Sequence, residues 1–102
     1  MTITHGFHAT IPAHPGKGDA LVELLLKAPA LDNDDCLVFL VGRSAASRDE
    51  VFVTEGWTSQ DAHRRFFASD IARAFTAEVG ALVAGEPRYV DEVPVGGKAA
   101  IG

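Results

Sequence analysis

Two neighbouring strand patterns in the middle of the chain are apolar on both faces, and this feature restricts the possible folds more than any other. CLVFLVGRS (residues 36–44) and EVFVTEGW (residues 50–57) are separated by AASRD, whose composition predicts a hairpin turn. The first strand has apolar side chains of both parities: Leu37, Phe39 and Val41 on one face, Val38 and Leu40 on the other. An antiparallel sheet that packs helices on one face usually leaves its other face polar. A second apolar layer must therefore cover this sheet.

The segments on either side of this hairpin predict two further strands and two helical regions. Residues 2–12 alternate in a way that is typical of a strand, and residues 86–94 form the last strand pattern. Apolar residues recur at helical spacing in residues 19–28 and again in residues 58–85. The order βαββαβ predicts an α+β, ferredoxin-like protomer with one antiparallel sheet.

Individual residues predict where the helices begin and which face is buried. Asp19 is the expected N-cap of the first helix. Thr58 or Ser59 caps the next helix, and Asp61 fits a capping box with Thr58. Ser69 is expected to cap a second segment of this region. The buried stripe of that segment is predicted to consist of Ile71, Phe75, Val79 and Leu82.

The apolar outer face of the sheet predicts a homodimer. Two helical regions cover only one face, and a chain of 102 residues has no segment left for a second sheet. A second copy of the chain, packed sheet against sheet, would cover the exposed apolar surface. We expect residues 1–93 to form the domain, and residues 94–102 to be a flexible or partner-docking tail.

Composition excludes several functional classes. The net charge of −5 argues against nucleic acid as a partner, because phosphate binding needs a basic surface. Cys36 is the single cysteine, so a disulfide framework is excluded and a cysteine-type zinc site is disfavoured; we expect Cys36 to be a buried small hydrophobe. The sequence has no secretory signal pattern and no apolar run of the roughly 20 residues needed to span a membrane. We therefore expect a cytoplasmic protein with no membrane partner and no metal site.

The residues with chemical potential gather near the end of the second hairpin strand. Trp57 either closes the core at the strand end or forms the wall of a pocket between helices and sheet. Glu55 is a carboxylate in an apolar strand, so it must be paired, hydrogen-bonded or near a cavity. Of these we favour an ion pair with an arginine across the sheet or dimer interface. His63 follows on the next helix and is either a hydrogen-bonded edge residue or a general base. His5 and His8 point to opposite faces of their strand and cannot chelate one metal ion.

The segment EGWTSQDAHRRFFASD resembles the strand-to-helix corner of the antibiotic biosynthesis monooxygenase family, and HPGKGDALVELL and CLVFLV extend the resemblance over much of the chain. The family consists of small dimeric α+β barrels that oxygenate phenols, quinols or polyketide aromatics without a cofactor. The resemblance therefore implies a homodimeric monooxygenase that uses a small aromatic substrate and O2, with no cofactor. It implies an apolar box that binds the substrate and a residue that accepts the proton of the substrate hydroxyl. We assign catalysis to His63, His8 and Trp57, and substrate binding to Trp57, His5, Phe66 and Phe39.

Two differences from the family keep a second hypothesis open. Many members have a histidine nine residues after the corner aromatic and another five residues later, where this chain has Phe66 and Ile71. A heme-degrading branch has its ligating histidine at the position of Thr76, which disfavours heme degradation here. The alternative is a non-catalytic, ligand-binding dimer on the same scaffold.

Overall fold

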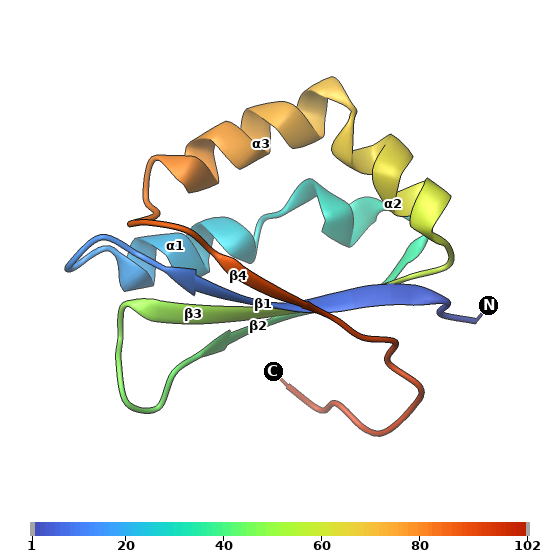
Figure 1. Ribbon diagram of the computed structural model, residues 1–102, viewed down its shortest axis with the longest axis horizontal. Helices are drawn as coiled ribbons and strands as arrows, with labels where there is room; N and C mark the ends of the chain where they lie inside the picture. The colour runs from blue at the N-terminus through green and yellow to red at the C-terminus, as the bar shows by residue number, and fades with distance from the viewer. Residues whose placement is uncertain (1, 102) are drawn as a thin grey trace.

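The computed structural model describes residues 2–101 and confirms the predicted order of strands and helices (Figure 1). The elements are β1 (His5–Pro12), α1 (Gly18–Leu25), the short 3₁₀ helix η1 (Pro29–Asp32), β2 (Cys36–Arg43), β3 (Glu50–Trp57), α2 (Gln60–Phe67), α3 (Asp70–Gly80) and β4 (Arg88–Asp91). The strands form one antiparallel sheet in the order β2-β3-β1-β4. The fold is therefore the ferredoxin-like α+β sandwich.

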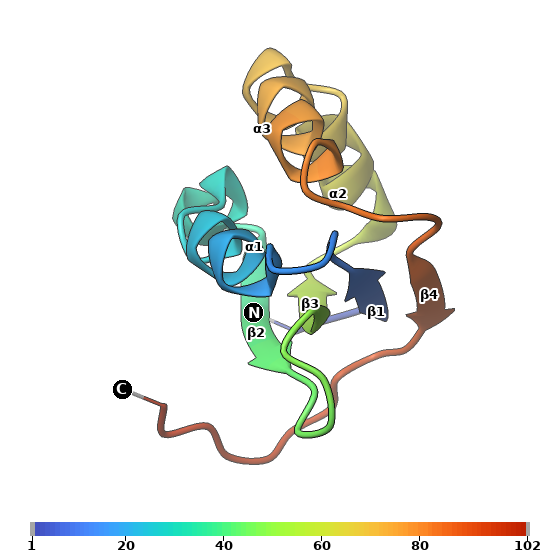
Figure 2. The same cartoon turned by 90° about the vertical axis from the view of Figure 1, so that its left-hand side faces the viewer.

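All helices lie on one face of this sheet, and Figure 2 shows the two layers end-on. The core between them contains Leu21 of α1 and Val51 of β3, both without exposed surface, together with Ala9 and Ile11 of β1. Beyond β4 the chain crosses to the other side and runs beneath the sheet (Figures 1 and 2). Within residues 2–101, no helix is both long enough and apolar enough to cross a membrane.

The start of α1 is held by a backbone corner instead of the predicted N-cap. Lys17 occupies the cap position without a side-chain hydrogen bond. Asp49, from the β2–β3 turn, accepts hydrogen bonds from the backbone N–H groups of Gly16 (3.0 Å) and Gly18 (2.9 Å), and these bonds lower the pKa of its carboxyl. A Cβ atom at Gly18 would overlap a backbone carbonyl of that turn, so glycine is required there. The prediction for Asp19 was wrong because the turn supplies the carboxylate; Asp19 lies within the first turn of the helix and pairs with arginines at the surface.

The caps of α2 and α3 follow the sequence more closely. Ser59 accepts a hydrogen bond from the backbone of Ala62, and Ser69 accepts one from Ala72, so both serine caps are confirmed. The capping box was wrong, because the hydroxyl of Thr58 donates to Asp35 at 2.8 Å and ties the start of the helix to the loop before β2.

The predicted stripe of α3 is correct except at its first residue. Phe75, Val79 and Leu82 pack against the core, whereas Ile71 is 64% exposed. Ala72, three residues before Phe75, is buried in its place. The helical spacing alone did not reveal which of these neighbouring residues is buried.

The outer face of the sheet carries apolar side chains of the opposite parity. Val38 and Leu40 of β2, Phe52 of β3 and Val90 of β4 belong to this face, and Leu40 and Val90 are exposed. Close to this face the tail begins with Pro94, which lies against the backbone where β1 and β3 pair. Leu40 and Val90 on this face are therefore not covered by the chain itself.

Candidate functional site

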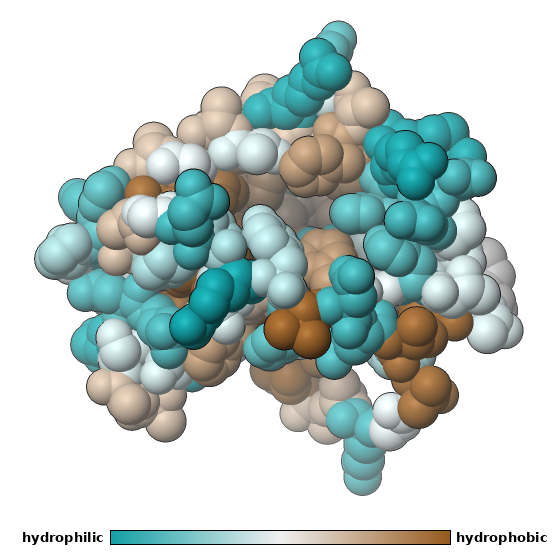
Figure 3. Space-filling model, viewed as in Figure 1, coloured by the Kyte–Doolittle hydropathy of each residue, from teal (hydrophilic) through white to brown (hydrophobic). Residues whose placement is uncertain are grey.

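A cavity of about 840 Å³ lies between the sheet and the helices. Figure 3 shows it as a hollow near the middle of the molecule, with apolar residues inside. The sheet supplies the floor, and α2, α3 and the segment after α1 supply the remaining walls. Its main apolar lining residues are Phe7, Ala9, Ile11, Phe39, Val53, Phe66, Phe75 and Val79. Its polar lining residues are His5, Glu55, Gln60, His63, Arg64, Arg73, Thr76, Tyr89 and Asp91.

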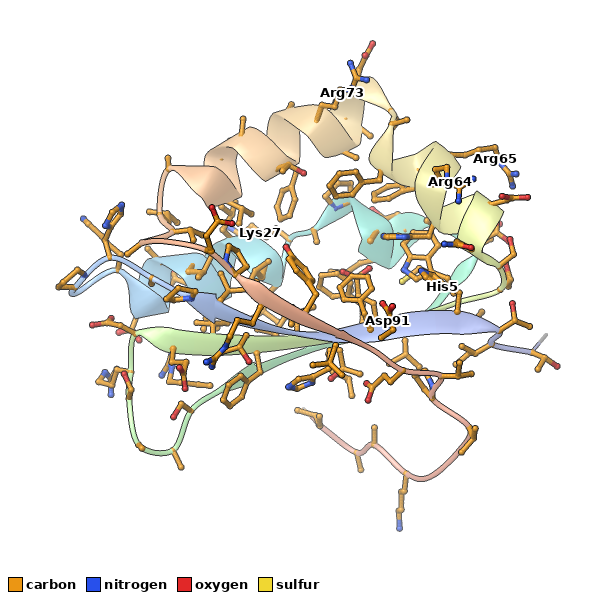
Figure 4. The ribbon with its side chains drawn as sticks, viewed as in Figure 1. His5, Lys27, Arg64, Arg65, Arg73 and Asp91 are labelled. Atoms are coloured by element: carbon orange, nitrogen blue, oxygen red, sulfur yellow. The ribbon has the colours of Figure 1, made fainter. Side chains whose placement is uncertain are left out.

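His63 projects from α2 into a group of aromatic rings at one end of the cavity. Its ring centroid lies 5.3 Å from that of His5, 5.4 Å from that of Phe7 and 5.0 Å from that of Trp57. Figure 4 shows His5 in the space between β1 and α2. Partial burial, and then the nearby His5, lower the pKa of His63 below its usual value. A neutral imidazole is therefore favoured near pH 7, and a neutral imidazole can accept a proton.

Trp57 lies behind the cavity surface. The structure places its indole at the end of β3 with no exposed area, packed against Phe66 (5.3 Å between ring centroids), Ala30 and Ala62. The indole N–H donates a hydrogen bond of 2.8 Å to Oε1 of Glu55. Through these contacts Trp57 supports two cavity residues, Glu55 and His63, without lining the cavity itself.

Glu55 lines the cavity from the centre of the sheet. Its neighbours on the adjacent strands are Phe7 of β1 and Phe39 of β2. The expected ion pair with an arginine is absent from residues 2–101; the partner is Trp57, two positions along the same strand. Desolvation raises the pKa of the Glu55 carboxyl, and the hydrogen bond from Trp57 only partly opposes this effect. Glu55 and His63 line the same cavity, and titratable groups with shifted pKa values are typical of functional sites.

The remaining histidines are not part of this cavity. His8 has the opposite parity to His5 and lies on the outer face, where its Nδ1 is 3.1 Å from Oγ1 of Thr54 and its ring packs on Phe52 (5.8 Å). His14 is exposed in the loop after β1. Of the histidines selected from the sequence, the structure brings together His5 and His63.

Phe66 and Phe39, both expected to bind substrate, line the cavity, and so does Thr76. The Thr76 hydroxyl donates to the backbone carbonyl of Ala72 at 2.8 Å. Within residues 2–101, no group of three or more His, Cys, Asp or Glu side chains is arranged to hold a metal ion.

Sequence reasoning missed Tyr89 and Asp91, which extend the floor of the cavity. They lie on β4 opposite Ala9 and Phe7 of β1, so their side chains share the helix-facing side of the sheet. Tyr89 and Asp91 are two residues apart in the last strand pattern, so the sequence could have predicted that they share a face. The sequence of that segment did not predict its pairing with β1.

Comparison with known proteins defines the family. The family model described as "Antibiotic biosynthesis monooxygenase" matches residues 4–78, which include β1 to β3, the corner at Trp57 and most of α3. The chain belongs to the antibiotic biosynthesis monooxygenase family. A search of the curated proteins found no match.

Solved structures from several bacteria share the fold. A candidate antibiotic biosynthesis monooxygenase of Chloroflexus aurantiacus has 26% identity and a TM-score of 0.81, over 93% of this chain and 96% of that one. A second candidate, from Caulobacter crescentus, has 26% identity and a TM-score of 0.80 over 93% and 92% of the two chains. A third, from Deinococcus radiodurans, has 20% identity and a TM-score of 0.76 over 97% and 100%. Each of these matches spans at least 92% of both chains, so the shared fold extends over nearly the whole length of each.

Proposed function

We propose that this protein is a cofactor-independent monooxygenase that oxidises a small phenolic, quinol or polyketide-type aromatic with O2. The observation that carries the proposal is His63, a partly buried imidazole with a lowered pKa in an aromatic-lined cavity of about 840 Å³. A cavity of this volume is in the range that encloses a small organic ligand. The family match supports oxygenation as the general reaction class.

The proposed reaction begins when the hydroxyl of a bound phenol loses its proton to His63. The resulting oxyanion passes one electron to O2, and the radical pair recombines as a peroxide on a ring carbon that also carries hydrogen. Proton return to the peroxide and loss of water then leave a quinone, with one oxygen atom on the product and the other in the water. The protein orients the ring, excludes solvent and holds the proton.

Oxygen consumption tests this proposal. The purified protein is incubated with a panel of quinols and naphthalenediols, and O2 uptake is followed against protein-free solutions. We expect uptake and quinone formation with at least one member of the panel. If aromatic ligands quench the fluorescence of Trp57 but no O2 is consumed, the alternative, a non-catalytic ligand-binding dimer, is correct. A Soret band on addition of hemin would instead indicate a porphyrin binder.

We also propose that the outer face of the sheet is covered by a second copy of the chain. Leu40 and Val90 are exposed on this face, beside the partly buried Val38 and Phe52. Beyond Pro94, Val95 and Ile101 of the tail are also exposed and could add apolar contacts in such a dimer. Burial of contiguous apolar surface is the main favourable contribution to association.

A charge at Leu40 is expected to convert this dimer to a monomer. Leu40→Glu places a carboxylate in the proposed interface, where it would be desolvated without a partner. Leu26→Glu is the matched control, because Leu26 is exposed at the end of α1, on the helix side of the sheet. Size-exclusion chromatography with light scattering measures the mass at micromolar concentration. A wild-type monomer, or a Leu40→Glu variant that stays dimeric, would contradict the proposed interface.

A further inference from the structure

Glu55 is the acidic side chain of β3 that lines the cavity, and only one of its two oxygens has a protein partner. Oε1 accepts the hydrogen bond of the Trp57 indole N–H at 2.8 Å. Oε2 has no hydrogen bond to any residue from 2 to 101. Because no fully buried side-chain oxygen or nitrogen in the described residues lacks a partner, Oε2 must be open to the cavity.

The surroundings of Glu55 do not explain why a carboxylate, and not an apolar side chain, occupies this position. On the same face of the sheet its neighbours are the rings of Phe7 and Phe39. Placing a carboxylate among apolar groups costs free energy unless hydrogen bonds compensate. Residues 2–101 supply only one such bond to Glu55. A methionine or leucine would fill the same position without this cost. Oε2 is therefore an acceptor that a ligand in the cavity can use.

The indole of Trp57 restricts how that acceptor points. It has no exposed area and is packed against Ala30, Ala62 and Phe66, so its N–H has a fixed position. The bond from this N–H orients the carboxyl group of Glu55, and Oε2 is left for the cavity. An ionised carboxylate has acceptors only, so its partner must be a donor.

We infer that Oε2 of Glu55 accepts a hydrogen bond from a hydroxyl group of the ligand, and that this bond selects hydroxylated aromatics over their ethers. The inference rests on the proposed function in placing an aromatic substrate in this cavity, and it adds the residue that decides specificity. A buried site built to bond a hydroxyl strongly rejects an analogue that lacks the donor, because its own polar group is then left unpaired. A ligand with two hydroxyl groups would satisfy Glu55 on the sheet and His63 on α2.

Binding of two matched ligands tests the role of Glu55 without reference to turnover. 2-Naphthol can donate a hydrogen bond, whereas 2-methoxynaphthalene can only accept one. Both are titrated calorimetrically in the absence of O2 at pH 8, which favours the carboxylate. We expect the wild-type protein to bind 2-naphthol at least about tenfold more tightly, as for a hydrogen bond to a charged acceptor. Glu55→Gln presents an amide N–H to the ligand, and the ratio of the two dissociation constants should fall to about one or reverse.

Controls separate this role from a general effect on folding. Glu78→Gln changes an exposed carboxylate on α3 in the same way and should leave the ratio unchanged. Retained binding of 2-methoxynaphthalene by Glu55→Gln shows that the cavity is intact. If Glu55→Gln has the same ratio of the two dissociation constants as the wild-type protein, the role of Glu55 is refuted, even if the protein consumes O2. A changed ratio without O2 uptake would support Glu55 and refute the oxygenase proposal. Failure of the wild-type protein to bind either ligand would refute both.

Discussion

Trp57→Ala is expected to lower the free energy of unfolding by about 3–5 kcal/mol, the range for removing a buried aromatic side chain. The indole has no exposed surface, and it fills the space between Ala30, Ala62 and Phe66. The substitution also removes the hydrogen bond to Glu55, so a partly buried carboxyl loses the one donor that residues 2–101 supply. The loss of packing and the loss of the hydrogen bond therefore both lower the free energy of unfolding.

Trp57→Phe distinguishes these two contributions. It keeps an aromatic ring in the space but removes the N–H group, and we expect a smaller loss of about 1–3 kcal/mol. Tyr89→Ala is the control, since Tyr89 is a large but exposed aromatic residue, and its loss should change stability much less. Urea unfolding followed by far-ultraviolet circular dichroism measures all three variants at one protein concentration, because dimerisation would make stability concentration-dependent. Equal effects of Trp57→Ala and Tyr89→Ala would contradict the buried position.

His63→Gln is expected to lower kcat/KM for the proposed oxidation by about 10²–10⁴-fold, the usual contribution of a general base. Glutamine keeps a polar side chain of similar reach but cannot accept the proton. The base must be neutral in the free enzyme, so wild-type kcat/KM should fall as pH decreases through the pKa of His63. Burial and His5 place that pKa below the ordinary histidine value of 6.5. In the His63→Gln variant, the part of this decrease in kcat/KM at low pH that His63 causes should be absent.

His5→Gln is the control for this prediction. It removes a neighbour that lowers the pKa of His63, so the fall in kcat/KM should begin at higher pH, whatever the change in its maximum value. Stability gives a second readout that does not depend on turnover. A histidine whose pKa is lower in the folded state binds fewer protons there, so its contribution to stability is lost as pH falls below 6.5. His63→Gln should remove that part of the acid sensitivity. Wild-type kcat/KM in His63→Gln would exclude His63 as the base.

Local patterns were enough to predict the elements of this fold. The alternation in β1, the turn composition before β3 and the capping serines Ser59 and Ser69 depend on near neighbours in the chain, and all are confirmed. Two errors occur where a distant segment supplied the interaction. Asp49 holds the start of α1 in place of Asp19, and Asp35 binds the hydroxyl of Thr58.

The candidate site was predictable only in part, for the same reason. Strand parity showed from the sequence that His5 and His8 lie on opposite faces, and that Glu55 and Trp57 share a face. Strand parity could not show which face of the sheet the helices cover. The helices cover the face that carries His5, so His5 lies in the cavity and His8 lies outside it.

The sequence by itself therefore determined the order of strands and helices, the family and the apolar character of both sheet faces, because these depend on local periodicity and residue type. Only the tertiary structure decided that Trp57 lies behind the cavity wall and that His63 meets His5. It also decided that one oxygen of Glu55 has no partner among residues 2–101. These are contacts between side chains whose positions depend on how α2 packs on the sheet. Packing geometry of this kind has no local signature in the chain.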